Sequence, residues 1–481
     1  MNYFLKNKPC QRPTSSFVNL TSGAVKAADS AHIDDIITKT AKQIFVMTHR
    51  TRQENIQTKW IVALMVILIS LTMRAPALAA SENEPIPVGN YIYWDDGISL
   101  TGPVSHVNLK VGGKINYDLG NINADEELQA AFSDFDGFHD DFRRLSVSLL
   151  GHAWDVFEFK VEVDFANIRD VKDQWIRFTK GSFLPHFTFG HMKEPFSLDM
   201  LTSSNYLTFM ELTLPTRAFT PFRNFGVTAN GTWKDEKMTW AAGFFHDTGS
   251  YSDIGDAEDQ ISNSNGFDLA GRITGLPIYR DNGRELVHLG LSYLHRFRND
   301  AEDDPTAQDR TRPESRLTDD RLVDTSIFYD LGEDLISLES AWKNGPISLQ
   351  GEYFHNIINS YSSLQFNGWY AQGSWVVTGE SRKYHTGGGI FTGIVPENEF
   401  RFGTPGWGAV ELALRLSWVD LNDKFIQGGK ERNFSAGVNW YLRKKIRLMT
   451  NYVHVTVEDR AEPSIENGRA DIVMSRLQIN F

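Results

Sequence analysis

The chain ends in Asp471-Ile-Val-Met-Ser-Arg-Leu-Gln-Ile-Asn-Phe481, and this stretch decides the fold. Two sets of residues alternate along this stretch. Val473, Leu477, Ile479 and Phe481 form the apolar set, and Met474, Arg476, Gln478 and Asn480 form the other, mostly polar set. Alternation with a period of two predicts a strand that has one apolar face. A last strand that ends on an aromatic residue favours a barrel of the bacterial outer membrane, although an ordinary edge strand can end in the same way.

The same alternation recurs from about residue 104 onward, and it is clearest in Val156-Phe-Glu-Phe-Lys-Val-Glu-Val-Asp-Phe165. There the apolar side chains fall on one face and Lys160 falls on the other face with three carboxylates. Further segments of this kind are 145–150, 183–190, 225–234, 238–245, 286–295, 347–355, 369–377 and 409–418. Alternation alone fits both a soluble sandwich and a membrane barrel that turns its apolar face to lipid.

An export signal separates these two alternatives. Lys59 and Trp60 open a short apolar run that stops at Arg74, and Ala-Pro-Ala-Leu-Ala-Ala follows it to Ala80. This pattern predicts a secretory signal peptide over 59–80. We interpret 1–58 as an N-terminal extension, with Met47 as the biological start; a cytoplasmic segment before an uncleaved anchor is the alternative. A short periplasmic segment is expected over 81–103, and a barrel over 104–481.

Composition supports a barrel without covalent cross-links. The chain has 481 residues, 41% of them apolar, and its one cysteine precedes the signal. Mean hydropathy is −0.34, which suits strands that face lipid with alternate residues only. Ten basic and four acidic residues lie in 1–80, which leaves 38 basic and 57 acidic ones, a net charge of −19. This excess of acid argues against nucleic acid as a partner.

Strand and loop lengths predict the size and orientation of the barrel. About 25 residues per strand, loops included, give an all-β transmembrane antiparallel barrel of about 16 strands with a water-filled lumen. Residues 434–457 predict a hairpin with a basic turn at 443–445, which is typical of the periplasmic end. The longer links 247–265 and 298–321 are expected to be external loops.

Five stretches together resemble the phosphate-selective porins of the O and P type. The most distinctive contains Gly190-His-Met-Lys193-Glu-Pro195-Phe196, Thr202-Ser-Ser204, Phe209-Met-Glu211 and Phe219-Thr-Pro221-Phe-Arg223-Asn-Phe-Gly226. The others are 93–97 with 109–118, 142–145 with 158–165, 375–382, and 406–415 with 420 and 437–441. The resemblance covers about 91–481. It implies a 16-stranded trimeric porin in which an external loop enters the pore and a ladder of arginines leads anions inward.

This resemblance also implies which residues line the pore. The candidates for anion conduction are Arg143, Arg144, Lys160, Lys193, Arg217 and Arg223. Guanidinium groups bind phosphate oxygens in pairs, and fixed positive charge in a pore selects anions. If Leu145 sets the lipid-facing phase, Arg143 shares that phase unless a bulge intervenes, whereas Arg144 faces the lumen. Salt bridges in a loop or at the interface are the alternative role for both arginines.

The block resembling the constriction departs from the family pattern. Glu211 is followed by Leu212 where the family often has arginine, and 191–226 contains three basic and three acidic residues. We therefore expect passive diffusion of small hydrophilic solutes with a modest preference for phosphate and other oxyanions. A structural or adhesive barrel without an open channel is the alternative.

No motif for catalysis, a cofactor or a metal is visible in the sequence. We do not expect an enzyme, and we expect no cofactor. The expected partners are the lipid and lipopolysaccharide of the outer membrane, two further copies of the chain, and the barrel-assembly machinery through Phe481.

Overall fold

A computed structural model describes residues 91–94, 98–101, 107–166, 170–179, 185–246, 260–262, 266–298, 305–403 and 405–481. These residues belong to one of two units of the chain, Pro85–Phe481. The signal peptide predicted over 59–80, the extension 1–58 and the start at Met47 lie outside the described residues. None of the described helices has the length and apolar character that crossing a bilayer requires.

The described strands form one large antiparallel sheet of eighteen strands. Two of them, β1 (Tyr91–Trp94) and β2 (Ile98–Thr101), make a hairpin whose second strand pairs with β3. The remaining sixteen close into a barrel, which confirms the predicted strand number. They are β3 (Val107–Ala124), β4 (Gly137–Ala153), β5 (Phe157–Asp164), β6 (Asp170–Phe178), β7 (His186–Lys193), β8 (Arg223–Trp233), β9 (Met238–His246), β11 (Phe267–Arg280), β12 (Glu285–Phe297), β16 (Gly332–Asn344), β17 (Ile347–Asn359), β18 (Ser363–Val376), β21 (Ala409–Asp423), β22 (Ile426–Arg443), β23 (Ile446–Arg460) and β24 (Ile465–Asn480).

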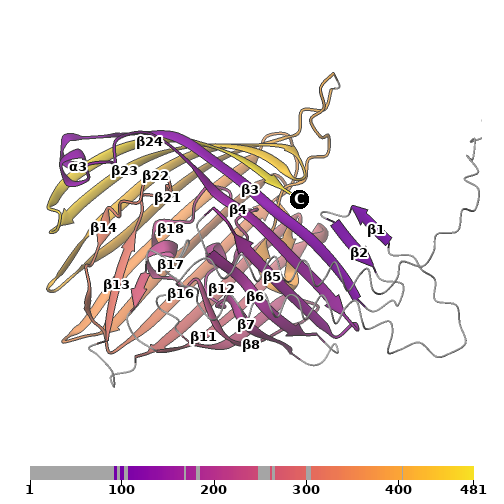
Figure 1. The fold of residues 1–481 in the computed structure, drawn as a ribbon, viewed down its shortest axis with the longest axis horizontal. Helices are drawn as coiled ribbons and strands as arrows, with labels where there is room; N and C mark the ends of the chain where they lie inside the picture. The colour runs from indigo at the N-terminus through magenta and orange to yellow at the C-terminus, as the bar shows by residue number, and fades with distance from the viewer. Residues whose placement is uncertain are drawn as a thin grey trace, which may run out of the picture. The chain divides into compact units, whose positions relative to one another are not determined.

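The barrel closes between its first and last strands, which lie side by side in Figure 1. Asn480 pairs with Lys114 and Ala470 pairs with Ala124. The terminal Phe481 extends this pairing: its backbone N–H donates to the Gly113 carbonyl over 2.9 Å, and its backbone oxygen accepts the Gly113 N–H over 2.8 Å. Among the described residues each of the sixteen barrel strands pairs with a neighbour on both sides. The wall therefore has no open edge, which hydrocarbon would not tolerate.

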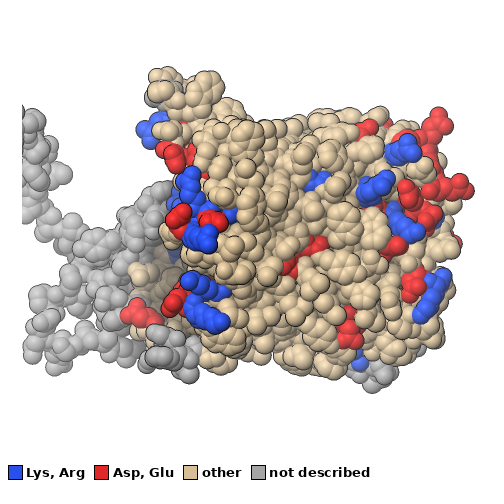
Figure 2. Space-filling model, turned by 180° about the vertical axis from the view of Figure 1, so that it is seen from behind, with Lys and Arg blue, Asp and Glu red and all other residues tan. Residues whose placement is uncertain are grey.

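The alternation predicted from the sequence separates the two faces of the wall. In β21, Leu412, Leu414 and Leu416 are exposed on the outside, whereas Glu411, Arg415 and Ser417 are buried inside. Figure 2 shows the outcome on one side of the molecule, where charged residues gather toward the two ends and leave a largely uncharged belt between them. A lipid-facing barrel needs such a belt, whereas a soluble sandwich would bury these leucines.

One end of the barrel has mostly short turns, among them 154–156, 234–237, 345–346 and 444–445. The predicted hairpin at 434–457 is confirmed by β22 and β23 and their basic turn. This is the periplasmic end, because short turns are periplasmic and long loops external. Phe481 and the turn residue Lys445 meet there, since the Asn480 N–H donates to the Lys445 carbonyl.

Three long connections fold back into the barrel among the described residues. The loop 194–222 carries α4 (Leu198–Leu201) and α5 (Leu214–Phe219). The segment 305–331 carries β13 (Thr306–Thr311), β14 (Val323–Asp324) and β15 (Phe328–Tyr329), with β13 also pairing to β10 (Gln260–Ser262). The connection 377–408 contains β19 (Tyr384–His385), η3 (Thr386–Gly388) and β20 (Ile390–Phe391) and rises from the periplasmic end.

The segment 305–331 corrects the prediction that 298–321 is simply an external loop. It starts at the end of the barrel opposite the periplasmic turns and then enters the lumen. There Glu314 accepts hydrogen bonds from Arg415 over 2.7 Å and from Ser435 over 3.0 Å. Two short elements complete the connections, α3 (Glu126–Ala131) after β3 and η2 (Asp281–Gly283) after β11. The lumen is therefore narrowed by backbone from both ends.

Candidate functional site

A cavity of about 920 Å³ lies inside the barrel, between the strands β3–β9, the inward loop 194–222 and the connection 377–408. Fourteen lysines or arginines and three acidic side chains are among the described residues that line it. All six candidates from the sequence are included: Arg143, Arg144, Lys160, Lys193, Arg217 and Arg223. The cavity is thus strongly cationic in a chain whose overall charge is negative.

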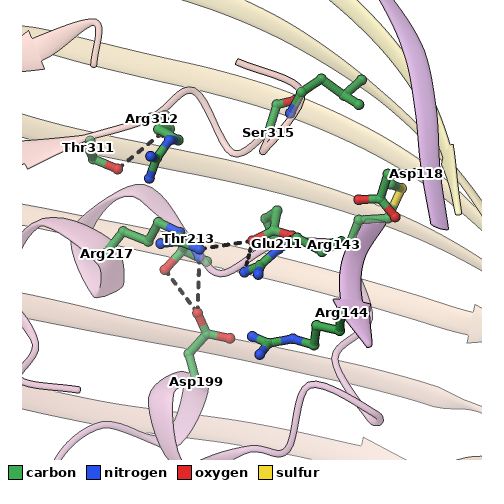
Figure 3. A network of polar contacts seen from close by, with 12 residues as sticks. Asp118, Arg143, Arg144, Asp199, Glu211, Thr213, Arg217, Thr311, Arg312 and Ser315 are labelled. Carbon is green, nitrogen blue, oxygen red and sulfur yellow. Dashed lines mark hydrogen bonds and ion pairs between the residues drawn. The ribbon is translucent and has the colours of Figure 1, made fainter. Parts of the chain in front are cut away.

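Glu211 of the inward loop is the centre of a buried group of charges. Arg143 donates to both of its carboxylate oxygens, over 2.8 and 3.1 Å. Arg217 donates to Oε2 over 3.0 Å, and Arg476 donates to Oε1 over 2.8 Å. Figure 3 shows the side chains of Arg143 and Arg217 converging on this carboxylate. Asp118 accepts two further hydrogen bonds from Arg476, each 2.6 Å long.

The electrostatics of Glu211 follow from this arrangement. Burial alone would raise the pKa of its carboxyl, but Arg143, Arg476 and Arg217 together hold that pKa well below its ordinary range. Glu211 therefore stays ionised at neutral pH and fixes three guanidinium groups around one point.

A bulge explains how Arg143 and Arg144 both face inward. The register of β3 and β4 shifts between Asn116 and Asp118, so that Asn116 pairs with Arg144 while Asp118 pairs with Asp141. Arg143 and Arg144 are only 4% and 8% exposed, although their neighbours on either side face outward. Arg143 thus does not share the lipid-facing phase of Leu145: the alternative of a bulge applies, because an extra residue reverses the phase at this point.

Lys160 and Arg223 belong to a second group that is built on two carboxylates. Asp173 lies 2.5 Å from the Lys160 Nζ and 2.7 Å from the Arg223 Nε. Glu162 lies 2.7 Å from the Lys160 Nζ and 2.8 Å from the Lys114 Nζ. Three cations and two carboxylates thus share one side of the cavity wall, which reduces its net charge without removing it.

The remaining candidates occupy different positions. Lys193, at the end of β7, donates from Nζ to the Met200 carbonyl and so ties the inward loop to the wall. Arg144 lies 3.5 Å from Asp164 in β5. Arg217 sits on α5, a helix that Pro215 opens after Thr213. The structure therefore brings Arg143 and Arg217 into one group and Lys160 and Arg223 into another. Arg144 and Lys193 belong to neither group.

Sequence reasoning missed several cations that line the same cavity. They are Lys110, Lys114, Arg177, Arg272, Lys383, Lys444, Lys445 and Arg476. Arg476 was visible in principle, because it falls on the polar face of the last strand opposite Leu477. Lys383 was not, since only the folded connection 377–408 places it inside the barrel. That connection is held by Arg272, which donates to the carbonyls of Gly388 and Gly389 over 3.3 and 2.9 Å.

A closed barrel of sixteen antiparallel strands with an apolar belt and a charged internal cavity defines a channel-type protein of the outer membrane. A sequence model of the family described as "Phosphate-selective porin O and P" matches residues 109–481. The chain belongs to this family. It is accordingly located in the bacterial outer membrane and forms a channel for passive diffusion.

Comparison with individual proteins finds relatives of similar length. Porin O of Pseudomonas aeruginosa is 25% identical over 437 residues, which cover 80% of this chain and 91% of the relative. An uncharacterized protein of Caulobacter vibrioides is 26% identical over 384 residues, covering 78% and 74%. Among solved structures, an anion-selective porin from Comamonas acidovorans aligns at 13% identity over 78% of this chain and 100% of that one, with a TM-score of 0.47.

Proposed function

We propose that this porin admits small hydrophilic solutes with a modest preference for anions, above all phosphate and other oxyanions. The observation that carries the proposal is the lining of the cavity, in which fourteen cations accompany three acidic side chains. Loop charges outside the lumen are screened beyond about 8–10 Å at ordinary salt. Charges in a narrow passage with low-dielectric walls act on an ion strongly, so the cavity outweighs the acidic exterior.

The anion preference is modest because three acidic side chains partly neutralise the cations of the cavity. Glu211, Glu162 and Asp173 each contact two or more basic groups that line the cavity. A permeating anion competes with these carboxylates for the same N–H donors. The site thus attracts oxyanions, with arginine forks that fit their oxygens, and does not retain them tightly.

Assembly as a homotrimer is the second part of the proposal. The strands β5, β6 and β7 have only 8, 9 and 8 residues, whereas β22 and β24 have 18 and 16. At about 3.3 Å per residue and a tilt of about 45°, eight residues span roughly 19 Å, less than an apolar band of about 25 Å. A neighbouring copy packed on this low wall would shield it from lipid.

Reversal potentials in planar bilayers across a KCl gradient test the anion preference. We expect the wild-type potential to indicate chloride over potassium, and Arg144→Ala and Arg223→Ala to lower that preference. Arg280→Ala is the matched control, because Arg280 lies at the end of β11, is exposed and pairs with Glu285. A wild-type preference for cations would contradict the proposal.

Single-channel recording separates this function from that of a closed structural or adhesive barrel. Discrete steps of conductance are expected. The cavity reaches the periplasmic turn, where Lys444 and Lys445 line it. A correctly folded protein that conducts no ions would favour the closed barrel instead.

A further inference from the structure

The inward loop 194–222 presents an apolar surface to the cavity. Met200, Leu212 and Phe222 pack together, with Leu212 only partly buried, and all three line the cavity. Tyr206 of the same loop also lines it and is 39% exposed. We call Met200, Tyr206, Leu212 and Phe222 the apolar shelf. An apolar surface of this kind inside a hydrophilic passage is not required for conducting hydrated inorganic ions.

The apolar shelf adjoins the buried group of cations around Glu211. Leu212 directly follows Glu211, the carboxylate that gathers Arg143, Arg217 and Arg476. The Arg217 guanidinium carbon lies 5.8 Å from the centre of the Phe222 ring. Because Leu212 packs against Phe222, this part of the apolar shelf lies beside the arginine group in the cavity lining.

The connection 377–408 fixes the outer part of the shelf. Arg382 donates to the Tyr206 carbonyl over 3.2 Å. Gly393 faces the Tyr206 ring so closely that a Cβ at this position would lie 2.9 Å from ring atom Cδ1. The ring is thus backed on one side by main chain of 377–408, and its orientation is set by the fold.

The arginine group around Glu211 and the apolar shelf favour chemically different parts of a solute. A phosphate or carboxylate group binds guanidinium N–H donors, whereas a hydrocarbon or aromatic group gains free energy by leaving water for an apolar surface. Inorganic phosphate is hydrated on every side and can use only the first of these contacts. An anion with an apolar body next to its charge can use both.

We propose that this cavity selects organic anions that carry a hydrocarbon or aryl group beside a phosphate or carboxylate, in preference to inorganic phosphate. The inference rests on the anion preference proposed above and names the class of solute for the same cavity. Leu212 and Tyr206 are the residues that determine this specificity, while the arginines supply the attraction common to all anions.

Block of the chloride current in planar bilayers by phenyl phosphate and by inorganic phosphate tests the inference. At about pH 8 both are mainly dianions, so the aryl group is the main difference. We expect half-block by phenyl phosphate at a concentration at least tenfold lower, which corresponds to about 1.4 kcal/mol. Phenol is the neutral control and should not block, because the shelf alone lacks the charge contact.

Variants of Leu212 give the internal test. Leu212→Arg and Leu212→Asn should abolish the tenfold advantage of phenyl phosphate, and Leu212→Met, which keeps the apolar volume, should retain it. Equal block by the two anions in the wild type would overturn the inference, as would an advantage that survives in Leu212→Asn. If the KCl reversal potential itself shows no anion preference, the proposed function fails; if that preference is intact without discrimination, only the present inference fails.

Discussion

Glu211 of the inward loop and Arg476 of the last strand are joined by a hydrogen bond of 2.8 Å between Oε1 and Nη2. The bond links the inward loop 194–222 to β24, the strand that closes the barrel. Through Arg143 and Arg217 the same carboxylate also reaches β4 and α5. The neutral charge count of 191–226 therefore reflects anchoring of the loop, and the cations that complete the group come from other strands.

Glu211→Gln is expected to strengthen anion preference and weaken the fold. Removing one partner of a buried ion pair typically costs about 3–5 kcal/mol, so the free energy of unfolding in detergent should fall. Loss of this negative charge beside three guanidinium groups should raise the chloride preference in KCl reversal potentials. Glu314→Gln is the matched control, because Glu314 is buried against Arg415 yet does not line the cavity. A similar gain of chloride preference in Glu314→Gln would contradict this role of Glu211.

The pH dependence of stability should contain a contribution from Glu211. Burial opposes ionisation, but Arg143, Arg476 and Arg217 depress the pKa of its carboxyl well below 4.5 in the folded state. The stabilisation is then fully present above pH 4.5, because the carboxyl is ionised in both states. It is lost as pH falls below 4.5 toward the folded-state pKa, since the unfolded chain binds the proton first. Urea unfolding between about pH 3 and pH 7 should show this loss in the wild type and not in Glu211→Gln.

Much of the fold could be predicted from the sequence, because alternation is a local property of each strand. The inward and outward faces of β21 and β24 follow directly from residues 410–418 and 473–481. Arg143 shows where this reasoning ends, since one extra residue in β4 reverses the phase without a sequence signal. The burial of Glu314 was equally hidden. Its segment is rich in charge, and the hydrogen bonds from Arg415, across 101 positions, and from Ser435 compensate for its removal from water.

The outward face makes a prediction about lipid contact. Leu416, near the middle of β21, is exposed on the outside of the barrel. Leu416→Arg should destabilise the barrel in bilayers by about 2–4 kcal/mol, the cost typical of arginine near the midplane. Phe425→Arg is the control, because Phe425 is also exposed but lies in the turn between β21 and β22. A comparable loss in both variants would mean that the two positions share one environment.

Closure of the barrel should depend on the contact between Phe481 and Gly113. The two residues exchange backbone hydrogen bonds of 2.8 and 2.9 Å, and each such bond contributes roughly 0.5–1.5 kcal/mol. A Cβ at position 113 would lie 2.5 Å both from the Phe481 ring and from the Ser146 carbonyl oxygen. Gly113→Ala must therefore displace either the terminal ring or the backbone of β4.

Deletion of Phe481 and Gly113→Ala should both lower the fraction of chains that assemble into the outer membrane, measured as heat-modifiable barrel on gels. The matched control is Gly275→Ala, since a Cβ at Gly275 in β11 would meet no atom within 4 Å. The deletion and Gly113→Ala together distinguish two roles of Phe481: packing against Gly113 when the barrel closes, and recognition by the assembly machinery. Gly113→Ala keeps the terminal aromatic residue that the assembly machinery would read, so normal assembly of this variant with failure of the deletion would assign the role of Phe481 to recognition and not to closure.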